Sequence, residues 1–171
     1  GDVMYDVSLY YRYLARSRSD VLDRFNLKEG EYVLATCHRA ENTDDPNRLR
    51  EIALALADLA ANQAVILPVH PRTAKIMAVQ GLTAVMRNVK LVDPLPFLDM
   101  IRLEQSARVI VTDSGGVQKE AFFYDVFCVT TRDETEWVET VELGWNVLTG
   151  ASRERIFSAA SSPSRPKEKN K

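Results

Sequence analysis

Two histidines stand where side-chain chemistry is expected. His38 and His70 each follow directly on a short apolar run that is typical of a β-strand. Imidazole can act as an acid or a base near neutral pH, so a histidine at such a position can serve catalysis. A single histidine more often has a structural role, but both histidines of this chain stand at strand ends. We therefore expect at least one of them to be functional.

A second candidate is the turn at residues 113–116, which reads Asp-Ser-Gly-Gly between an apolar run and a helical pattern. Free backbone N–H groups and the positive end of the helix dipole can hold a phosphate there, and glycine permits close approach. Glu120, about one helical turn further on, could accept hydrogen bonds from sugar hydroxyls. The turn matches neither Gly-x-Gly-x-x-Gly nor a P-loop, so a plain strand-to-helix turn remains the alternative.

Charged side chains next to these strand ends have two interpretations each. Arg39 could bind phosphate through its planar guanidinium or be a surface residue. Glu41 could be an acid or base, but a capping role in the next helix is favoured. Arg132 follows the fifth predicted strand and faces the same side of the sheet. It could belong to the site or simply pair with Asp133 or Glu134.

Other patterns narrow the chemistry. Phe97 and Met100 are three residues apart on a predicted helix and could flank a base-binding slot or belong to the core. Ser114 lacks the Gly-x-Ser-x-Gly elbow of serine hydrolases. The chain has neither His-Glu-x-x-His nor closely spaced cysteines, so we expect no metal site. Cys37 and Cys128 lie in apolar runs and are interpreted as reduced core residues.

Strand and helix patterns alternate along the chain, and a polar loop covers residues 38–45. Asp45 and Pro46 are suited to the N-cap and first position of a helix. The predicted strands cover 31–37, 64–69, 89–92, 108–112, 126–131 and 146–148. The predicted helices cover 3–26, 46–60, 72–80, 97–104, a segment after Gly116, part of 132–143, and 152–160.

This alternation predicts an α/β fold with a Rossmann-like, doubly wound parallel sheet. In such sheets, ligands bind at the carboxyl ends of the strands where the winding reverses. If the strands take the common order 3-2-1-4-5-6, the reversal lies between the first and fourth strands. Residues 38–42 and 113–116 would then flank one crevice.

Bulk properties bound the function. The 171 residues suggest one domain, with 46% hydrophobic and 27% charged residues and a net charge of −2. This balance favours neither nucleic-acid nor membrane partners. No signal peptide or membrane span is visible, so we expect a cytoplasmic protein. We divide the chain into a linking helix at 1–28, a ligand-binding domain at 29–160 and a disordered polar tail at 161–171.

Four motifs occur in a fixed order and spacing. They are HRAEN at 38–42, PLPFLDM at 94–100, TDSGGVQKEA at 112–121 and RDETEW at 132–137. With them the chain resembles the C-terminal domain of the non-hydrolysing UDP-N-acetylglucosamine 2-epimerases, from residue 1 to about residue 156. The resemblance implies one half of a two-domain GT-B-type fold, with UDP bound mainly on this half.

The resemblance also implies an activity without a cofactor or metal. Members interconvert UDP-N-acetylglucosamine and UDP-N-acetylmannosamine. They eliminate UDP to give a 2-acetamidoglucal and add it back with inverted configuration at C2. The implied catalytic residue is His38, and the implied substrate-binding residues are Arg39, Met100, Ser114, Gly115, Gly116 and Glu120, with the Ser-Gly-Gly backbone on phosphate and Glu120 on the ribose.

The family's carboxylate acid/base residues lie in an N-terminal domain that this chain lacks. We therefore expect a fragment that is inactive alone, cut from a parent enzyme of cell-surface polysaccharide biosynthesis. The expected parent is a cytoplasmic homodimer. A donor-binding domain of a GT-B glycosyltransferase and a non-catalytic UDP-sugar sensor remain as alternatives.

Several positions depart from the family pattern. Several bacterial members have a second arginine at Ala40. Many members have glutamate at Lys119, an aromatic residue at Met100 near the base, and Arg-Pro at 137–138. These departures affect contacts to phosphate and uridine. They leave room for a related substrate, such as a UDP-linked diacetamido uronic acid.

Overall fold

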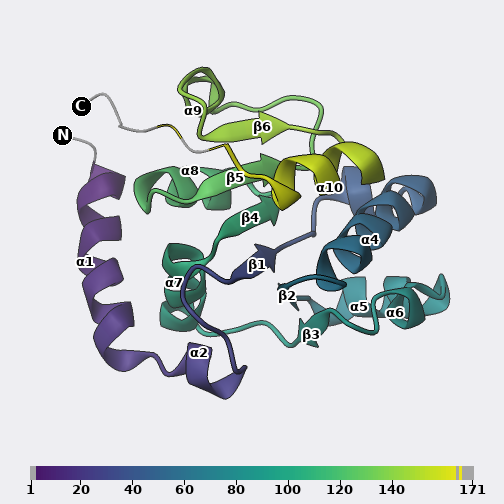
Figure 1. Cartoon of the computed structure of the whole chain (residues 1–171), viewed down its shortest axis with the longest axis horizontal. Helices are drawn as coiled ribbons and strands as arrows, with labels where there is room; N and C mark the ends of the chain where they lie inside the picture. Colours follow the sequence, from purple (N-terminus) through teal and green to yellow (C-terminus); the bar gives the residue numbers. More distant parts are fainter. Residues whose placement is uncertain (1–2, 165, 167–171) are drawn as a thin grey trace.

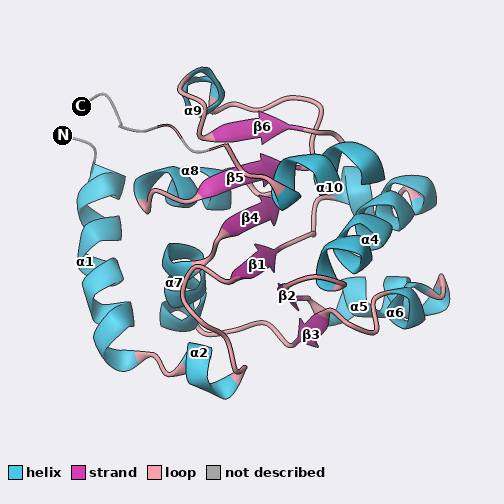
Figure 2. Cartoon of the chain, in the orientation of Figure 1, coloured by secondary structure: helices cyan, strands magenta, loops and turns pink. Residues whose placement is uncertain are grey.

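A six-stranded parallel sheet forms the centre of the molecule (Figures 1 and 2). The computed structural model describes residues 3–164 and 166. The strand order is β3-β2-β1-β4-β5-β6, which confirms the order assumed from the sequence. The strands are β1 (Tyr32–Ala35), β2 (Ala64–Pro68), β3 (Lys90–Val92), β4 (Val109–Thr112), β5 (Phe127–Thr130) and β6 (Asn146–Leu148).

The winding of the sheet reverses at β1. Val33 in β1 pairs with Val65 in β2 on one side and with Val109 in β4 on the other. The chain fills the sheet outward from β1 to β3, then returns to β4 and continues to β6. The carboxyl ends of β1 and β4 are therefore neighbours, and the loops that leave them must diverge over opposite faces.

Helices cover both faces of the sheet, as Figure 1 shows. Alternate residues of a strand point to opposite faces, so Val33 and Ala35 join one core cluster while Tyr32 and Leu34 join the other. The first cluster contains buried residues of α4, α5, α6 and α10, and the second contains residues of α1, α2, α7 and α8. Both faces are apolar, as expected for a buried parallel sheet.

The helices mostly fall where the sequence places them, and two short ones were not expected. One of these replaces part of the predicted polar loop after β1, and the other follows α5. The helices are α1 (Val3–Arg18), α2 (Val21–Arg24), α3 (Ala40–Thr43), α4 (Pro46–Ala60), α5 (Pro71–Val79), α6 (Leu82–Val85), α7 (Phe97–Ser106), α8 (Gly115–Phe123), α9 (Val138–Glu142) and α10 (Arg153–Ser161).

The prediction of one continuous helix over 3–26 is wrong, because the chain breaks after Arg18. Ser19 Oγ lies 2.6 Å from Asp99 Oδ1, to which it donates, and accepts from the Val21 N–H at 3.3 Å. The side chain thus satisfies a backbone donor locally and competes with helix continuation. A contact across 80 residues, which periodicity cannot reveal, fixes the break.

The apolar side of α1 is largely exposed in the described structure. Val3 and Tyr13 are 74% and 73% exposed, and only Ala15 of this helix belongs to the buried apolar core. The stripe read from the sequence therefore forms a helix, but its outer half packs against little of the described chain.

The local signal at the start of α4 agrees with the sequence. Asp45 caps α4, since its Oδ1 accepts from the backbone N–H of Asn47 at 2.9 Å and of Arg48 at 3.2 Å, and Pro46 occupies the first position.

The last helix, α10, ends at Ser161, whereas residues 162–164 form no helix or strand. Most of the predicted tail, 165 and 167–171, lies outside the described residues, so its disorder stays a prediction.

No helix among the described residues combines the length and apolar character of a membrane span.

Candidate active site

A fully buried carboxylate, Asp113, organises the edge where β1 and β4 end. Its oxygens accept hydrogen bonds from the backbone N–H of His38 at 3.1 Å and of Arg39 at 3.0 Å. They also accept from the Asn42 side-chain amide at 3.0 Å. Several N–H donors on one carboxylate compensate its desolvation. Asp113 thereby fixes the course of the chain directly after β1.

Asn42 extends this network to the neighbouring strand. Its Nδ2 also donates to the backbone oxygen of Thr131 at 3.1 Å, and its Oδ1 accepts from Arg48 Nε at 3.0 Å. The residue is fully buried and lies in the short helix α3. Asn42 and Asp113 belong to two separate sequence motifs, and only the folded chain brings them within hydrogen-bond distance.

His38 is placed at the rim of this network with its ring toward solvent. Its Nδ1 lies 3.8 Å from Asp113 Oδ1, while 57% of the side chain is exposed. The backbone is held and the imidazole is free to meet a ligand, which suits an acid or base. His70 also lies at the carboxyl end of its strand, but its Nδ1 accepts from the Arg72 N–H at 3.1 Å and caps α5.

Arginine and glutamate side chains form a charged group beside His38. Arg132 is 8% exposed, and its Nε lies 3.3 Å from Glu41 Oε1. Its Nη1 donates to Glu136 Oε2 at 3.0 Å. Arg39 Nε lies 4.0 Å from the same Glu41 oxygen. Arg132 therefore pairs with Glu41 and Glu136, and not with the adjacent acids that sequence reasoning considered.

The Asp-Ser-Gly-Gly turn begins α8 as predicted. Ser114 caps the helix, because its Oγ accepts from the Val117 N–H at 3.3 Å, and its own N–H donates to Thr112 Oγ1 at 2.9 Å. Thr112 Oγ1 also lies 2.6 Å from Thr36 Oγ1, which links the ends of β4 and β1. The backbone N–H groups of Gly115 and Gly116 stand at the positive end of the α8 dipole.

Gly115 is crowded in a way that the sequence does not indicate. A Cβ added at Gly115 would collide with Glu136 Oε1 and would lie 3.4 Å from Trp137 Nε1. At Gly116 an added Cβ would meet only Glu120 Oε1 and Ser114 Oγ, each at an ordinary 3.9 Å. Glu136 and Trp137 are thus site residues that sequence reasoning did not single out as ligands or neighbours of the turn.

Glu120 points into an apolar hollow of about 250 Å³ between α1, α7 and α8. Phe97 lines the same hollow and meets Tyr11 edge-on, with ring centroids 4.9 Å apart. Met100, the expected base contact, packs against the core cluster beneath. Phe97 therefore lines this hollow, whereas Met100 does not.

Glu104 is a buried carboxyl that sequence reasoning missed. It lies on α7 with 2% exposure and is hydrogen-bonded to Glu120 on α8. Burial, followed by the hydrogen bond and charge of Glu120, raises the pKa of Glu104 well above its ordinary value. Glu104 Oε1 has no further partner among the described residues. The signal in the sequence was a glutamate on the core side of a predicted helix.

The cysteines and the acidic residues bear on thiol and metal chemistry. Cys37 and Cys128 are free and buried, and burial raises the pKa of the Cys128 thiol to about 12. Among described residues, no group of three or more His, Cys, Asp or Glu side chains is placed to hold a metal ion.

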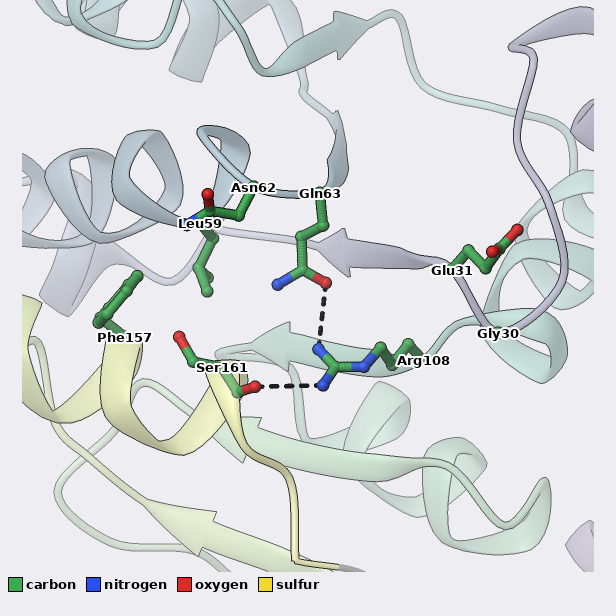
Figure 3. Close-up of a pocket in the computed structure, with 8 residues that line it drawn as sticks. All are labelled: Gly30, Glu31, Leu59, Asn62, Gln63, Arg108, Phe157 and Ser161. Atoms are coloured by element: carbon green, nitrogen blue, oxygen red, sulfur yellow. Dashed lines mark hydrogen bonds between the residues drawn. The ribbon is translucent and has the colours of Figure 1, made fainter.

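A larger hollow, of about 570 Å³, lies at the opposite edge of the sheet (Figure 3). Its wall includes Arg108, which donates to Gln63 Oε1 at 3.2 Å and to the backbone oxygen of Ser161 at 3.1 Å. These bonds join the start of β4 to the ends of α4 and α10. The hollow lies at the amino ends of the strands, away from the glycine turn and both histidines.

Comparisons with known proteins agree with this geometry. A family model described as UDP-N-acetylglucosamine 2-epimerase matches residues 1–171. A UDP-N-acetylglucosamine 2-epimerase homolog of Methanococcus maripaludis is 47% identical over 161 residues, covering 92% of this chain and 44% of the relative. The UDP-2,3-diacetamido-2,3-dideoxy-D-glucuronate 2-epimerase of Pseudomonas aeruginosa is also 47% identical, covering 94% and 43%.

Solved structures agree as well. The UDP-GlcNAc 2-epimerase of Methanocaldococcus jannaschii superposes with a TM-score of 0.87 at 36% identity, covering 95% of this chain and 47% of that one. Its complex with UDP-GlcNAc and UDP gives a TM-score of 0.83. This chain spans less than half the length of these relatives. Its doubly wound sheet corresponds to one Rossmann-like half of them, and the chain belongs to the UDP-N-acetylglucosamine 2-epimerase family.

Proposed function

We propose that this chain is the UDP-binding half of a UDP-sugar 2-epimerase. The observation that carries the proposal is the glycine turn at the start of α8, which lies beside His38 at the reversal of the sheet. The turn would hold the diphosphate through the backbone of Ser114, Gly115 and Gly116, with Arg39 as a further cation. The Methanocaldococcus jannaschii relative, whose structure contains UDP-GlcNAc and UDP, supports this assignment.

Glu120 and Phe97 would serve the nucleoside. The hollow that they line is apolar enough for a base, and the Glu120 carboxylate can accept hydrogen bonds from ribose hydroxyls. Glu120 lies one turn beyond Gly116, which is a suitable separation between diphosphate and ribose. Met100 would support this wall from below and not contact the base directly.

The proposed reaction removes the proton on sugar C2 while the C1–O bond to UDP breaks. The electron pair of the C–H bond becomes the C1=C2 double bond of a glycal, and UDP leaves with the anomeric oxygen. Re-addition of UDP, with a proton delivered to the other side of C2, gives the epimer. On this chain, His38 would hold or move a proton beside the leaving diphosphate, where charge develops.

The rest of the proposed enzyme would supply the carboxylate acid and base. An N-terminal half would close over the carboxyl edge, exclude water and cover apolar side chains such as Tyr13 of α1. We propose a cytoplasmic homodimer as the whole protein. The substrate class is a UDP-2-acetamido sugar. The Pseudomonas aeruginosa relative favours a diacetamido uronic acid as one candidate beside UDP-N-acetylglucosamine.

Calorimetric titration of the chain with UDP tests the site. Replacing Gly115 with Val should abolish binding, because the added side chain fills the space that the phosphate needs. The fold should tolerate the change, since the colliding group is the end of a half-exposed glutamate that can swing away. Unchanged UDP binding by a folded Gly115→Val chain would refute the assignment.

Exchange of the C2 proton with solvent separates the three functional classes on the full-length protein. An epimerase exchanges this proton, while a glycosyltransferase and a non-catalytic sensor do not. The 171-residue chain alone should show no measurable epimerisation, because one half of the cleft neither excludes water nor carries the expected carboxylates.

A further inference from the structure

A carboxylate of the chain itself, that of Glu136, lies against Gly115, the first residue of α8. Glu136 Oε1 lies so close to Gly115 that any side chain at that position would collide with it. The positive end of the helix dipole favours an anion near this point, as it would favour a phosphate. The proposed function puts the diphosphate at the same residue, so the carboxylate and the diphosphate would compete for the space beside Gly115.

Several contacts hold Glu136 in this position. Arg132 Nη1 donates to Glu136 Oε2 at 3.0 Å, and Arg132 itself is largely buried. Thr135 anchors the same segment to α8, because its hydroxyl donates to Gln118 Oε1 at 2.6 Å and accepts from the Trp137 N–H at 3.0 Å. The Trp137 ring lies 4.6 Å from Lys119 Nζ. The segment 132–137 is therefore clamped onto the start of α8.

The environment of Glu136 favours its charged form. A hydrogen bond from its own backbone, followed by the hydrogen bond and charge of Arg132 and the charge of Arg39, holds the pKa of Glu136 below its ordinary value. Half of the side chain is nevertheless exposed. Trp137 Nε1 is buried and has no hydrogen-bond acceptor among the described residues, and it points toward Gly115. Segment 132–137 thus contains a half-exposed anion, the Glu136 carboxylate, and a donor without an acceptor among the described residues, Trp137 Nε1.

We infer that Glu136 is an internal competitor for the phosphate cradle, displaced when a nucleoside diphosphate binds. Arg132 exchanges the Glu136 carboxylate for a ligand phosphate, and Trp137 Nε1 gains an acceptor. The inference rests on the proposed nucleotide site and concerns how that site is regulated. Because only molecules with Glu136 displaced can bind, the apparent affinity for UDP is lowered by the fraction of open molecules.

Titrations with UDP and with inorganic pyrophosphate test the inference on the whole chain. Glu136→Gln keeps the size of the side chain and removes its charge, so this variant should bind both ligands about tenfold more tightly. Pyrophosphate isolates the cradle, because it has neither base nor ribose. Glu134→Gln is the matched control, since Glu134 is an exposed acid of the same segment, and should leave both affinities unchanged.

The outcomes separate the inference from the proposed site. In one outcome, the unmodified chain binds UDP and pyrophosphate while Glu136→Gln binds them equally well or more weakly. That result would overturn the inference and leave the nucleotide site standing. If neither protein binds UDP or pyrophosphate, the proposed site is wrong and the inference falls with it. Melting temperatures of all variants establish that each one is folded.

An NMR titration of the Glu136 carboxyl gives a second readout. We expect its pKa to lie below the ordinary range without pyrophosphate and to rise when pyrophosphate saturates the chain. The pKa should rise because Glu136 loses its contacts with Arg132 and the start of α8 and gains the anionic ligand as a neighbour. A low pKa that does not change at saturation would mean that Glu136 keeps its place, which contradicts displacement.

Discussion

The two edges of the sheet differ in what they offer a ligand. The amino edge has the larger hollow, about 570 Å³, but its polar groups bond to one another, as Arg108 does to Gln63 and Ser161. The carboxyl edge presents an exposed imidazole and a helix terminus above a buried, hydrogen-bonded carboxylate. Directed polar groups, and not empty volume, therefore identify the site.

The physical reason lies in the direction of the strands. In a parallel sheet the loop after every strand begins at the carboxyl edge. A helix that follows such a loop, as α8 does, therefore starts there with free N–H groups. Helices end at the amino edge with carbonyl groups, which attract cations and donors such as the Arg108 guanidinium. The following predictions test this asymmetry, beginning with the largest expected effect.

Loss of the His38 imidazole should abolish most of the chemistry. In the full-length protein, His38→Asn should lower turnover by roughly 10²- to 10⁴-fold, the range typical of a lost acid or base. UDP affinity should change little, because the Ser114–Gly116 backbone remains, and calorimetry provides this internal control. Normal turnover in the variant would reduce His38 to a structural residue.

Removal of the Asp113 carboxylate should damage the carboxyl edge itself. Asp113→Ala leaves the N–H groups of His38 and Arg39 and the Asn42 amide without their acceptor. At about 1 kcal/mol for each buried donor, we expect the free energy of unfolding to fall by about 3 kcal/mol, measured by urea denaturation. The matched control is Asp133→Ala, whose carboxylate is 75% exposed and pairs with Arg48. Equal losses in both variants would show that Asp113 is not the organiser of this edge.

Glu104, buried between α7 and α8, should make stability depend on pH. Its pKa is raised in the folded chain, so the folded chain binds the Glu104 proton more tightly than the unfolded chain does. This contribution is complete below the ordinary carboxyl pKa and is lost as pH rises from there toward the raised pKa. The melting temperature of the chain should therefore fall with rising pH in this window.

Glu104→Gln should remove that pH dependence, because glutamine does not titrate. The decline, expected to be a few degrees, is measured by thermal unfolding at several pH values. Glu142→Gln, which changes an exposed acid at the end of α9, serves as the control and should keep the decline. An unchanged decline in Glu104→Gln would mean that another group titrates.

The amino edge should give the smallest effect. Arg108→Ala removes two hydrogen bonds at the rim of the larger hollow and should cost no more than about 1–2 kcal/mol of stability. It should not alter UDP affinity, because the variant lies at the far ends of the strands. A marked loss of UDP binding would mean that the larger hollow, and not the glycine turn, is the nucleotide site.

Much of this site could be predicted from local patterns. Asp45 before Pro46 predicted the start of α4, and Asp-Ser-Gly-Gly predicted the start of α8. Both predictions succeed because capping and turn formation involve residues within a few positions of one another. The short helices α3 and α6 were missed because four residues show no helical period. The break between α1 and α2 was missed because Ser19 is held by Asp99, which is distant in sequence.

The sequence by itself determined the alternation of strands and helices, the apolar faces, and the chemistry available at the strand ends. Only the tertiary structure decided which partners meet: Arg132 with Glu41 and Glu136, Glu104 with Glu120, and Glu136 with Gly115. Periodicity reports which face a residue occupies, since that depends on its neighbours along the chain. The identity of a partner depends on strand order and on the path of distant loops, which fix the distances between charges only after the sheet has formed.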